Sequence, residues 1–158
     1  MGPMTLIDGV RVKSLRVIPD ERGRLFEILR RDEPDLYTGF GQAYVTTTMP
    51  GVVKAWHYHE RQEDFFTCVR GMIRLAIYDD RLGSPTRGTV NEFFMGDHDM
   101  KLVVVPRRTW HGWKCISEHE AMILNLVSEP YDAASPDEIR RPPHDNGMFV
   151  FDWARRDG

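Results

Sequence analysis

The sequence has few cysteines, no long apolar run and no excess of positive charge. Its two cysteines, Cys68 and Cys115, lie far apart in runs typical of buried strands, so we expect both to be reduced core residues. No apolar run approaches the ~20 residues of a membrane-spanning helix. The first ten residues also lack the basic start of a signal peptide. We therefore expect a cytoplasmic protein with no membrane partner.

A formal net charge of -3 argues against a general nucleic-acid-binding surface, so we expect no nucleic-acid partner. The chain contains no P-loop, no G-x-G-x-x-G and no nucleophile elbow, which are signatures of common nucleotide and hydrolase sites. What it does contain is 158 residues, 41% of them hydrophobic, enough for one domain with a sizeable core.

Short runs of strand-forming residues, separated by Gly, Pro, Asp or Ser, fill most of the chain. Examples are "GQAYVTTTM", "DFFTCVRG" and "MIRLAIYDD". Such spacing predicts an all-β sandwich or barrel. One short helix is expected near the C-terminus, at "SPDEIRR", where Ser135 can cap the helix and Asp137 and Glu138 occupy its first turn.

The stretch "GVVKAWHYHERQEDFFTCVRG" holds two of the six histidines one residue apart. Because side chains at i and i+2 of a strand share a face, we expect His57 and His59 to point the same way. A carboxylate on the neighbouring strand, Glu63 or Asp64, would add a third ligand, and the distant His111 a fourth. Such a set suits Zn, Fe, Mn or Ni, with open positions for water or substrate.

The spacing G-x5-H-x-H-x4-D-x6-G, from Gly51 to Gly71, resembles the first motif of the cupin superfamily, with Asp64 in place of the usual glutamate. "PRRTWH" is similar to the second cupin motif, with Arg108 in place of a glycine. The six-residue gap to Gly71 favours Asp64 over Glu63. The resemblance implies a double-stranded jelly roll whose metal ligands are His57, His59, Asp64 and His111.

A further resemblance covers most of the chain. The dTDP-4-dehydrorhamnose 3,5-epimerase family is similar in the order of its segments, which here read "DERGRLFE", "FGQAYVTTT", "GVVKAWHYH", "VRGMIRLAIYDDRLGSPTRG", "VVVPRRTWHGW" and "VSEPYD". That family has the cupin fold, epimerises a dTDP-4-keto-6-deoxy sugar without metal, and forms dimers that share N-terminal strands. The resemblance implies a nucleotide-sugar substrate, a homodimer and a single cupin domain over 1–158. Within it we expect N-terminal strands at 5–48, a barrel core at 51–131 and a tail at 132–158.

Residue roles follow from the same resemblance. His57 matches the base that removes the proton next to the ketone, and His111 matches a second active-site histidine. Asp64 occupies a third catalytic position. Contacts to the sugar or nucleotide are implied for Arg22, Glu27, Gln42, Lys54, Arg107, Asn125 and Tyr131.

The chain departs from the family at several of these positions. The family's lysine falls on Asp64, its glutamine on His59 and its general-acid tyrosine on Asn125. The acidic partner of the catalytic histidine has no clear match, with Asp145 as one candidate. An enolate needs charge stabilisation, which a metal could supply as a Lewis acid. The sequence therefore leaves open a metal-binding pocket and a metal-free pocket.

Three functions remain in competition. The leading one is an epimerase or isomerase of a nucleotide-linked 4-keto-6-deoxy sugar; the others are a metal-dependent cupin oxygenase or sugar isomerase, and a non-catalytic sugar-nucleotide binder. Trp56, Trp110 and Trp113 flank the histidines and suit either stacking on a ligand or core packing. Asn125, inside an apolar run, suits either a pocket-facing role or a structural hydrogen bond.

Overall fold

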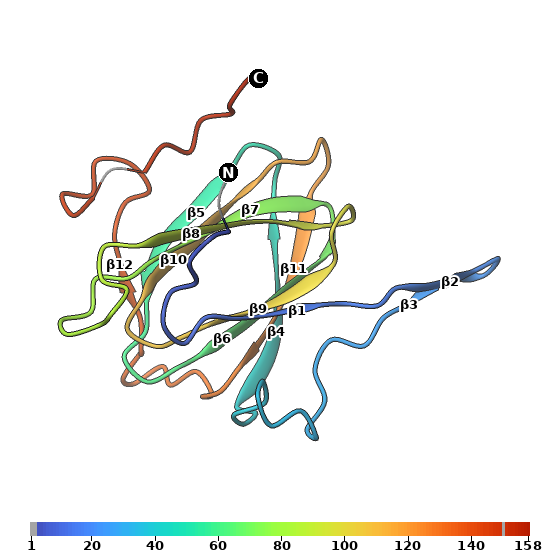
Figure 1. Ribbon diagram of the computed structural model, residues 1–158, viewed down its shortest axis with the longest axis horizontal. Helices are drawn as coiled ribbons and strands as arrows, with labels where there is room; N and C mark the ends of the chain where they lie inside the picture. Colours follow the sequence, from blue (N-terminus) through green and yellow to red (C-terminus); the bar gives the residue numbers. More distant parts are fainter. Residues whose placement is uncertain (1–2, 150) are drawn as a thin grey trace.

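The computed structural model describes residues 3–149 and 151–158, and strands joined by loops make up this part of the chain (Figure 1). The assigned strands are β1 (Arg11–Ser14), β2 (Ile18–Asp20), β3 (Gly23–Leu25), β4 (Gln42–Thr48), β5 (Val53–Tyr58), β6 (Asp64–Arg70), β7 (Met72–Tyr78), β8 (Val90–Gly96), β9 (Lys101–Val105), β10 (Trp110–Cys115), β11 (Ala121–Val127) and β12 (Ile139–Arg140).

Two five-stranded antiparallel sheets form the body of the molecule. The first has the order β1-β9-β6-β11-β4 and the second the order β12-β5-β10-β7-β8. Strands β2 and β3 form a separate hairpin, which projects away from the two sheets in Figure 1. The expected all-β class and the jelly-roll arrangement of two facing antiparallel sheets are confirmed.

The main core lies between the sheets and follows the alternation of side chains along each strand. On β6, Phe66 and Cys68 belong to this inner cluster, whereas Phe65 packs on the other side with Leu102 and Val104. Each large apolar side chain that is fully buried stabilises the fold by roughly 1.5–3 kcal/mol. Cys68 and Cys115 are both buried and free, as expected.

Segments outside the strands cover the outer faces of both sheets. Residues between β1 and β4, including Phe26 and Leu36, pack against the outer cluster of the first sheet. The C-terminal Trp153 packs with Trp56 and Trp110 on the outer face of the second sheet. Trp56 and Trp110, which lie next to the histidines in the sequence, are therefore core residues. Trp113 belongs to the inner cluster and stacks beside His57, with ring centroids 6.2 Å apart.

The prediction of a short C-terminal helix is wrong. Ile139–Arg140 forms strand β12, which pairs with Tyr58 and His57 at the edge of β5. Trp56 N donates to Arg141 O at 2.8 Å, and Arg141 N donates to Trp56 O at 2.9 Å. These long-range bonds satisfy an otherwise open strand edge, which outweighs the weak local preference for a helix. No helix in the described ranges is long and apolar enough to cross a membrane.

A β-bulge in β5 orients the side chains that matter most. His111 of β10 pairs with His57, but the next residue, Gly112, pairs with Ala55, and Trp113 pairs with Lys54. Cross-strand partners share a face, so the extra residue brings Lys54 and His57 to the same inner side of the sheet. Strands β5 and β10 lie too close together here for a side chain at position 112, because a Cβ on Gly112 would lie 2.2 Å from Ala55 Cβ.

Candidate functional site

A cavity of about 470 Å³ opens between the two sheets, and three of the histidines line it. His57 comes from β5, His59 follows that strand directly, and His111 comes from β10. The expectation that the paired histidines face one side is thus met. The other polar and aromatic side chains on the wall are Tyr44, Thr46, Lys54, Phe66, Trp113, Glu138 and Arg140.

His57 pairs with a carboxylate that lies far away in the sequence. Its Nδ1 is 2.9 Å from Glu138 Oε1. Burial raises the pKa of Glu138, but hydrogen bonds from Arg140 and His57 outweigh this, so the pKa lies below its usual value and the carboxylate is ionised at neutral pH. An ionised carboxylate accepts a hydrogen bond from Nδ1–H, which leaves Nε2 of the neutral His57 ring with a free lone pair.

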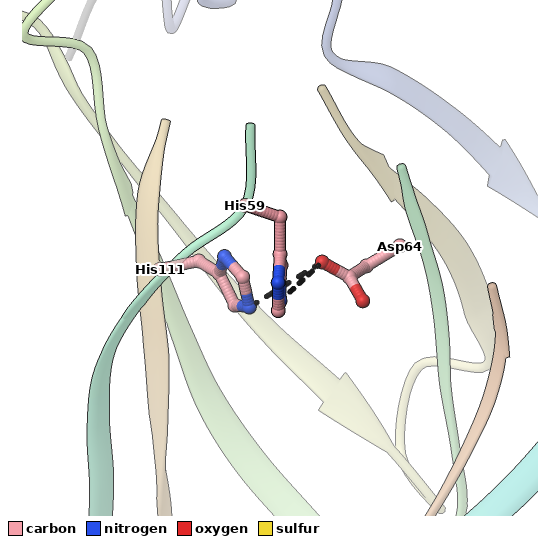
Figure 2. A group of neighbouring side chains, drawn as sticks. All are labelled: His59, Asp64 and His111. Atoms are coloured by element: carbon pink, nitrogen blue, oxygen red, sulfur yellow. Dashed lines mark ion pairs between the residues drawn. The ribbon is translucent and has the colours of Figure 1, made fainter. Parts of the chain in front are cut away.

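The second group of side chains lies deeper, around Asp64, and is shown in Figure 2. Its Oδ2 is 3.4 Å from His59 Nε2 and 3.5 Å from His111 Nε2. His59, Asp64 and His111 form a group whose candidate ligand atoms all lie within 4.8 Å of one another. His57 is not part of this group, and its Nδ1 contacts Glu138 instead.

Burial governs the ionisation of this group. Asp64 is 1% exposed, and desolvation raises its pKa despite the opposing effects of His59, Asn125 and Gln62. His111 is 2% exposed, and burial, reinforced by His59 and His57, holds its pKa well below the ordinary value. His111 is therefore a neutral imidazole at neutral pH, as metal coordination or general-base chemistry requires.

Backbone contacts fix His59. Its Nδ1 is 2.5 Å from the carbonyl oxygen of Asp137, and its own carbonyl accepts a hydrogen bond from Arg108 N at 2.7 Å. The Asp137 carboxylate accepts three backbone N–H bonds, at 2.9, 2.9 and 3.0 Å, from Glu60, Arg61 and Gln62. Burial raises the pKa of Asp137, but these three bonds lower it further than burial raises it. The turn after β5 is thus held in place by the segment that was expected to be a helix.

Asn125 links Asp64 to a tyrosine on the neighbouring strand. Its Nδ2 donates to Asp64 Oδ1 at 2.8 Å and to Tyr44 Oη at 2.9 Å, and its Oδ1 accepts from Phe65 N at 2.9 Å. Asn125 is therefore a structural hydrogen-bonding residue that positions two groups of the site. Burial, together with the Asp64 charge, raises the pKa of Tyr44 to about 12, so the phenol stays protonated.

A second cavity, of about 500 Å³, adjoins the first and shares Tyr44, His59, Glu138 and Arg140 with it. Gln42 and Tyr131 line it, and Gln42 Oε1 accepts a hydrogen bond from Tyr131 N at 2.9 Å. Two arginines, Arg61 and Arg140, share this wall with four carboxylates, and Arg140 is paired with one of them, Glu138, at 2.8 Å.

Other residues singled out from the sequence lie away from both cavities. Arg22 is on the β2–β3 hairpin, where its side chain is 84% exposed and paired with Asp20. Glu27 contacts Arg30, and Arg107 is exposed in the turn after β9. Two carboxylates also lie elsewhere: Glu63 pairs with Arg11 at 3.2 Å, so that Asp64 is the one facing the histidines, and Asp145 is exposed.

Sequence reasoning missed Glu138 and Tyr44 as functional residues. Glu138 was assigned to a helix, and only the pairing of β12 with β5 brings it to His57. Tyr44 lies directly opposite Asn125 in the pairing of β4 with β11. A cross-strand alignment of β4 with β11 was the only signal that could have found it, and the register was not known.

Comparisons with known proteins agree with this architecture. A family model described as dTDP-4-dehydrorhamnose 3,5-epimerase matches residues 4–154. The "Probable low-salt glycan biosynthesis epimerase Agl13" of Haloferax volcanii is 39% identical, over 95% of this chain and 96% of that protein. The spore coat polysaccharide biosynthesis protein SpsL of Bacillus subtilis is 36% identical, over 94% and 97%.

A solved structure gives the same result. The dTDP sugar isomerase of Desulfovibrio desulfuricans G20 superposes with a TM-score of 0.87 at 30% identity, covering 96% of this chain and 94% of that chain. Family model, relatives and structure all span nearly the whole sequence. The chain therefore belongs to the dTDP-4-dehydrorhamnose 3,5-epimerase family.

Proposed function

We propose that the protein is an epimerase of a nucleotide-linked 4-keto-6-deoxy sugar, with His57 as the base that removes a proton next to the ketone. The observation that carries this proposal is the contact of 2.9 Å between His57 Nδ1 and Glu138 Oε1 at the wall of the cavity. Glu138 fixes the tautomer and stabilises the imidazolium that forms when Nε2 takes the proton. Family membership supports the substrate class.

Inversion at a carbon atom needs a proton donor on the face opposite the base, and Tyr44 is placed to be that donor. It comes from β4 of the first sheet, whereas His57 comes from β5 of the second, so the two line the cavity from opposite sheets. The Tyr44 oxygen accepts the Asn125 hydrogen bond and keeps its own proton to donate. A phenol with a pKa of about 12 is protonated at neutral pH and suits protonation of an enolate.

Lys54 is the ammonium group nearest to this chemistry. Its Nζ donates to Thr47 O at 2.6 Å and to Thr46 Oγ1 at 3.3 Å, on the strand that also carries Tyr44. It lines the same cavity as His57. A cation held at this wall favours the negative charge that develops on the keto oxygen.

The adjoining cavity suits the nucleotide part of the substrate. Arg61 and Arg140 can bind a diphosphate, since guanidinium groups match phosphate oxygens in a bidentate manner. Tyr131, 66% exposed, offers a face for stacking on the base or sugar, and Gln42 offers hydrogen bonds. The sugar would then extend from this cavity into the one that holds His57.

We also propose that the protein is a homodimer that acts in the cytoplasm. The projecting β2–β3 hairpin exposes Ile18 (50%) and Leu25 (59%), which burial in a partner would stabilise. Arg22 and Glu27, which do not reach the cavities of their own chain, lie on or next to this hairpin. Free buried Cys68 and Cys115 suit a reducing compartment.

A metal-dependent cupin enzyme remains the second candidate, and the grouping of His59, Asp64 and His111 favours it. Both candidates predict chemistry in the same cavity, but only the first predicts inversion at a carbon next to the ketone of a nucleotide-linked sugar without a bound ion. Variants of the base and of the acid separate them.

The test is conversion of dTDP-4-keto-6-deoxyglucose in D2O, followed by proton NMR. We expect the wild type to incorporate deuterium and to form an inverted product. His57→Asn should lose both, whereas Tyr44→Phe should retain exchange from the base side and lose most of the inverted product. Nucleotide-sugar binding without exchange in the wild type would instead identify a non-catalytic binder, and equal activity in His57→Asn would remove the proposed base.

A further inference from the structure

The arrangement around Asp64 has the dimensions of a coordination shell. Two ligand atoms that each lie about 2.1 Å from one ion, at a tetrahedral angle, are about 3.4 Å apart. Asp64 Oδ2 is 3.4 Å from His59 Nε2 and 3.5 Å from His111 Nε2. The Nε2 atoms of His59 and His111 therefore lie about as far from this carboxylate oxygen as two ligand atoms of one tetrahedral ion lie from each other (Figure 2).

The remaining hydrogen bonds of the group leave these three atoms free to bind an ion. Asp64 Oδ1 accepts from Gln62 Nε2 and from Asn125 Nδ2, both at 2.8 Å, so Oδ2 is the oxygen that faces the histidines. The Asp137 carbonyl oxygen, 2.5 Å from His59 Nδ1, accepts a hydrogen bond from Nδ1–H, so the lone pair of that neutral ring is on Nε2. Metal-ligating histidines commonly have such a backbone carbonyl behind them.

His111 is the most deeply buried of the three histidines that line the cavity. It is 2% exposed, and its Nδ1 has no hydrogen-bond partner among the residues that the structure describes. Burying an imidazole without such bonds costs free energy. Coordination through Nε2 would leave Nδ1 as it is, so what bears on the ion is the placement of Nε2 at 3.5 Å from Asp64 Oδ2.

A shared proton is a poorer explanation of the geometry than an ion. A charge-assisted hydrogen bond between His59 and Asp64 would bring nitrogen and oxygen to about 2.7–2.9 Å. The observed separations of 3.4 and 3.5 Å are longer, and they are nearly equal for both histidines. One proton cannot lie between Oδ2 and two nitrogens at once, whereas one cation can.

We propose that His59, Asp64 and His111 form a binding site for one divalent transition-metal ion, such as Zn, Fe, Mn or Ni. Two imidazoles and a carboxylate suit these ions and leave coordination positions open toward the cavity that His57 lines. His57 lies outside this ligand group, and its Nε2 remains available as a base. An ion at this place would polarise the carbonyl oxygen of a bound ketone.

The test begins with protein made without an affinity tag, stripped with a chelator and loaded with each metal in turn. We expect about one equivalent of at least one metal by mass spectrometry, and a visible absorption spectrum of low-symmetry Co²⁺ after cobalt loading. A metal present at about 100 times its dissociation constant should raise the melting temperature by about 5–10 °C.

Variants assign the ligands. Asp64→Asn preserves the shape of the side chain and should lower metal affinity at least 100-fold, as should His111→Gln. His98→Gln, at an exposed histidine far from the group in sequence, is the matched control and should bind metal like the wild type. If Asp64→Asn fails to fold by circular dichroism, His59→Gln serves instead.

The outcomes separate this inference from the proposed function. Less than one tenth of an equivalent of every metal, with unchanged melting temperature, would overturn the metal site. If that protein still exchanges deuterium with a keto sugar, the base chemistry of His57 stands without the ion. Equal metal binding in Asp64→Asn and in the wild type would also overturn the site.

Discussion

Replacing Glu138 by glutamine removes the negative charge beside His57 and changes the shape of the side chain very little. The contact of 2.9 Å to His57 Nδ1 is a charge-assisted hydrogen bond on a carboxylate that is 26% exposed. Such bonds are worth about 1.5–3 kcal/mol. We expect the loss to appear mainly in the transition state, where the imidazolium forms, and to lower kcat by roughly 10- to 100-fold.

The assay is the initial rate of deuterium incorporation into a nucleotide-linked 4-keto sugar, measured over a range of pH. KM should change little, because Glu138 acts through His57 and its contribution grows as the proton is transferred. Glu120→Gln, at an exposed position between β10 and β11, is the control for a general effect of charge.

A change in kcat below twofold would show that Glu138 does not assist the base. Loss of activity that follows loss of folded protein would not test the idea. Melting temperature is therefore measured alongside, and Glu138→Asp is included, because it retains the charge and should recover part of the rate.

Other consequences concern stability and assembly. Asp79→Asn should destabilise the fold by about 2–4 kcal/mol at pH 7, because the buried carboxylate accepts bonds from Arg81, Ser84 and Thr86. These bonds outweigh burial and lower the pKa of Asp79. Its contribution to the free energy of unfolding is therefore present above pH ~4 and is lost as the pH falls. In urea unfolding, the difference in free energy of unfolding between wild type and Asp79→Asn should be smaller at pH 3 than at pH 7, and an equal difference at both pH values would contradict this. Arg108 has a left-handed φ of 64°, so Arg108→Gly should be more stable than Arg108→Ala by about 1 kcal/mol, and equal stabilities by the same assay would argue against backbone strain. Light scattering at micromolar concentration should give the mass of a dimer, and a monomer would contradict the proposed assembly.

Local patterning was sufficient for the class of fold and for much of the site. Alternation and turn residues predicted the strands, and the i, i+2 rule put His57 and His59 on one wall. The resemblance to the first cupin motif, through its six-residue gap to Gly71, favoured Asp64, which the structure brings to the histidines, whereas Glu63 pairs with Arg11. These features depend on spacing within one strand or one motif.

Features that depend on register between distant strands were not predictable in this way. The segment with Asp137 and Glu138 has a helical start signal, yet pairing with the β5 edge makes it a strand and brings Glu138 to His57. Simple alternation would place Lys54 and His57 on opposite faces, and only the bulge in β5 places them together. Tyr44 joins the site through its pairing with Asn125.

The central claim is that His57 removes a proton from the carbon next to the ketone of a nucleotide-linked sugar. The most direct measurement uses such a sugar labelled with deuterium at the carbons that flank the ketone, incubated with the protein in ordinary water and followed by mass spectrometry. We expect the wild type to wash out the label and His57→Asn, at equal folded concentration, to retain it. Full retention of the label by the wild type, or equal loss in His57→Asn, would contradict the account.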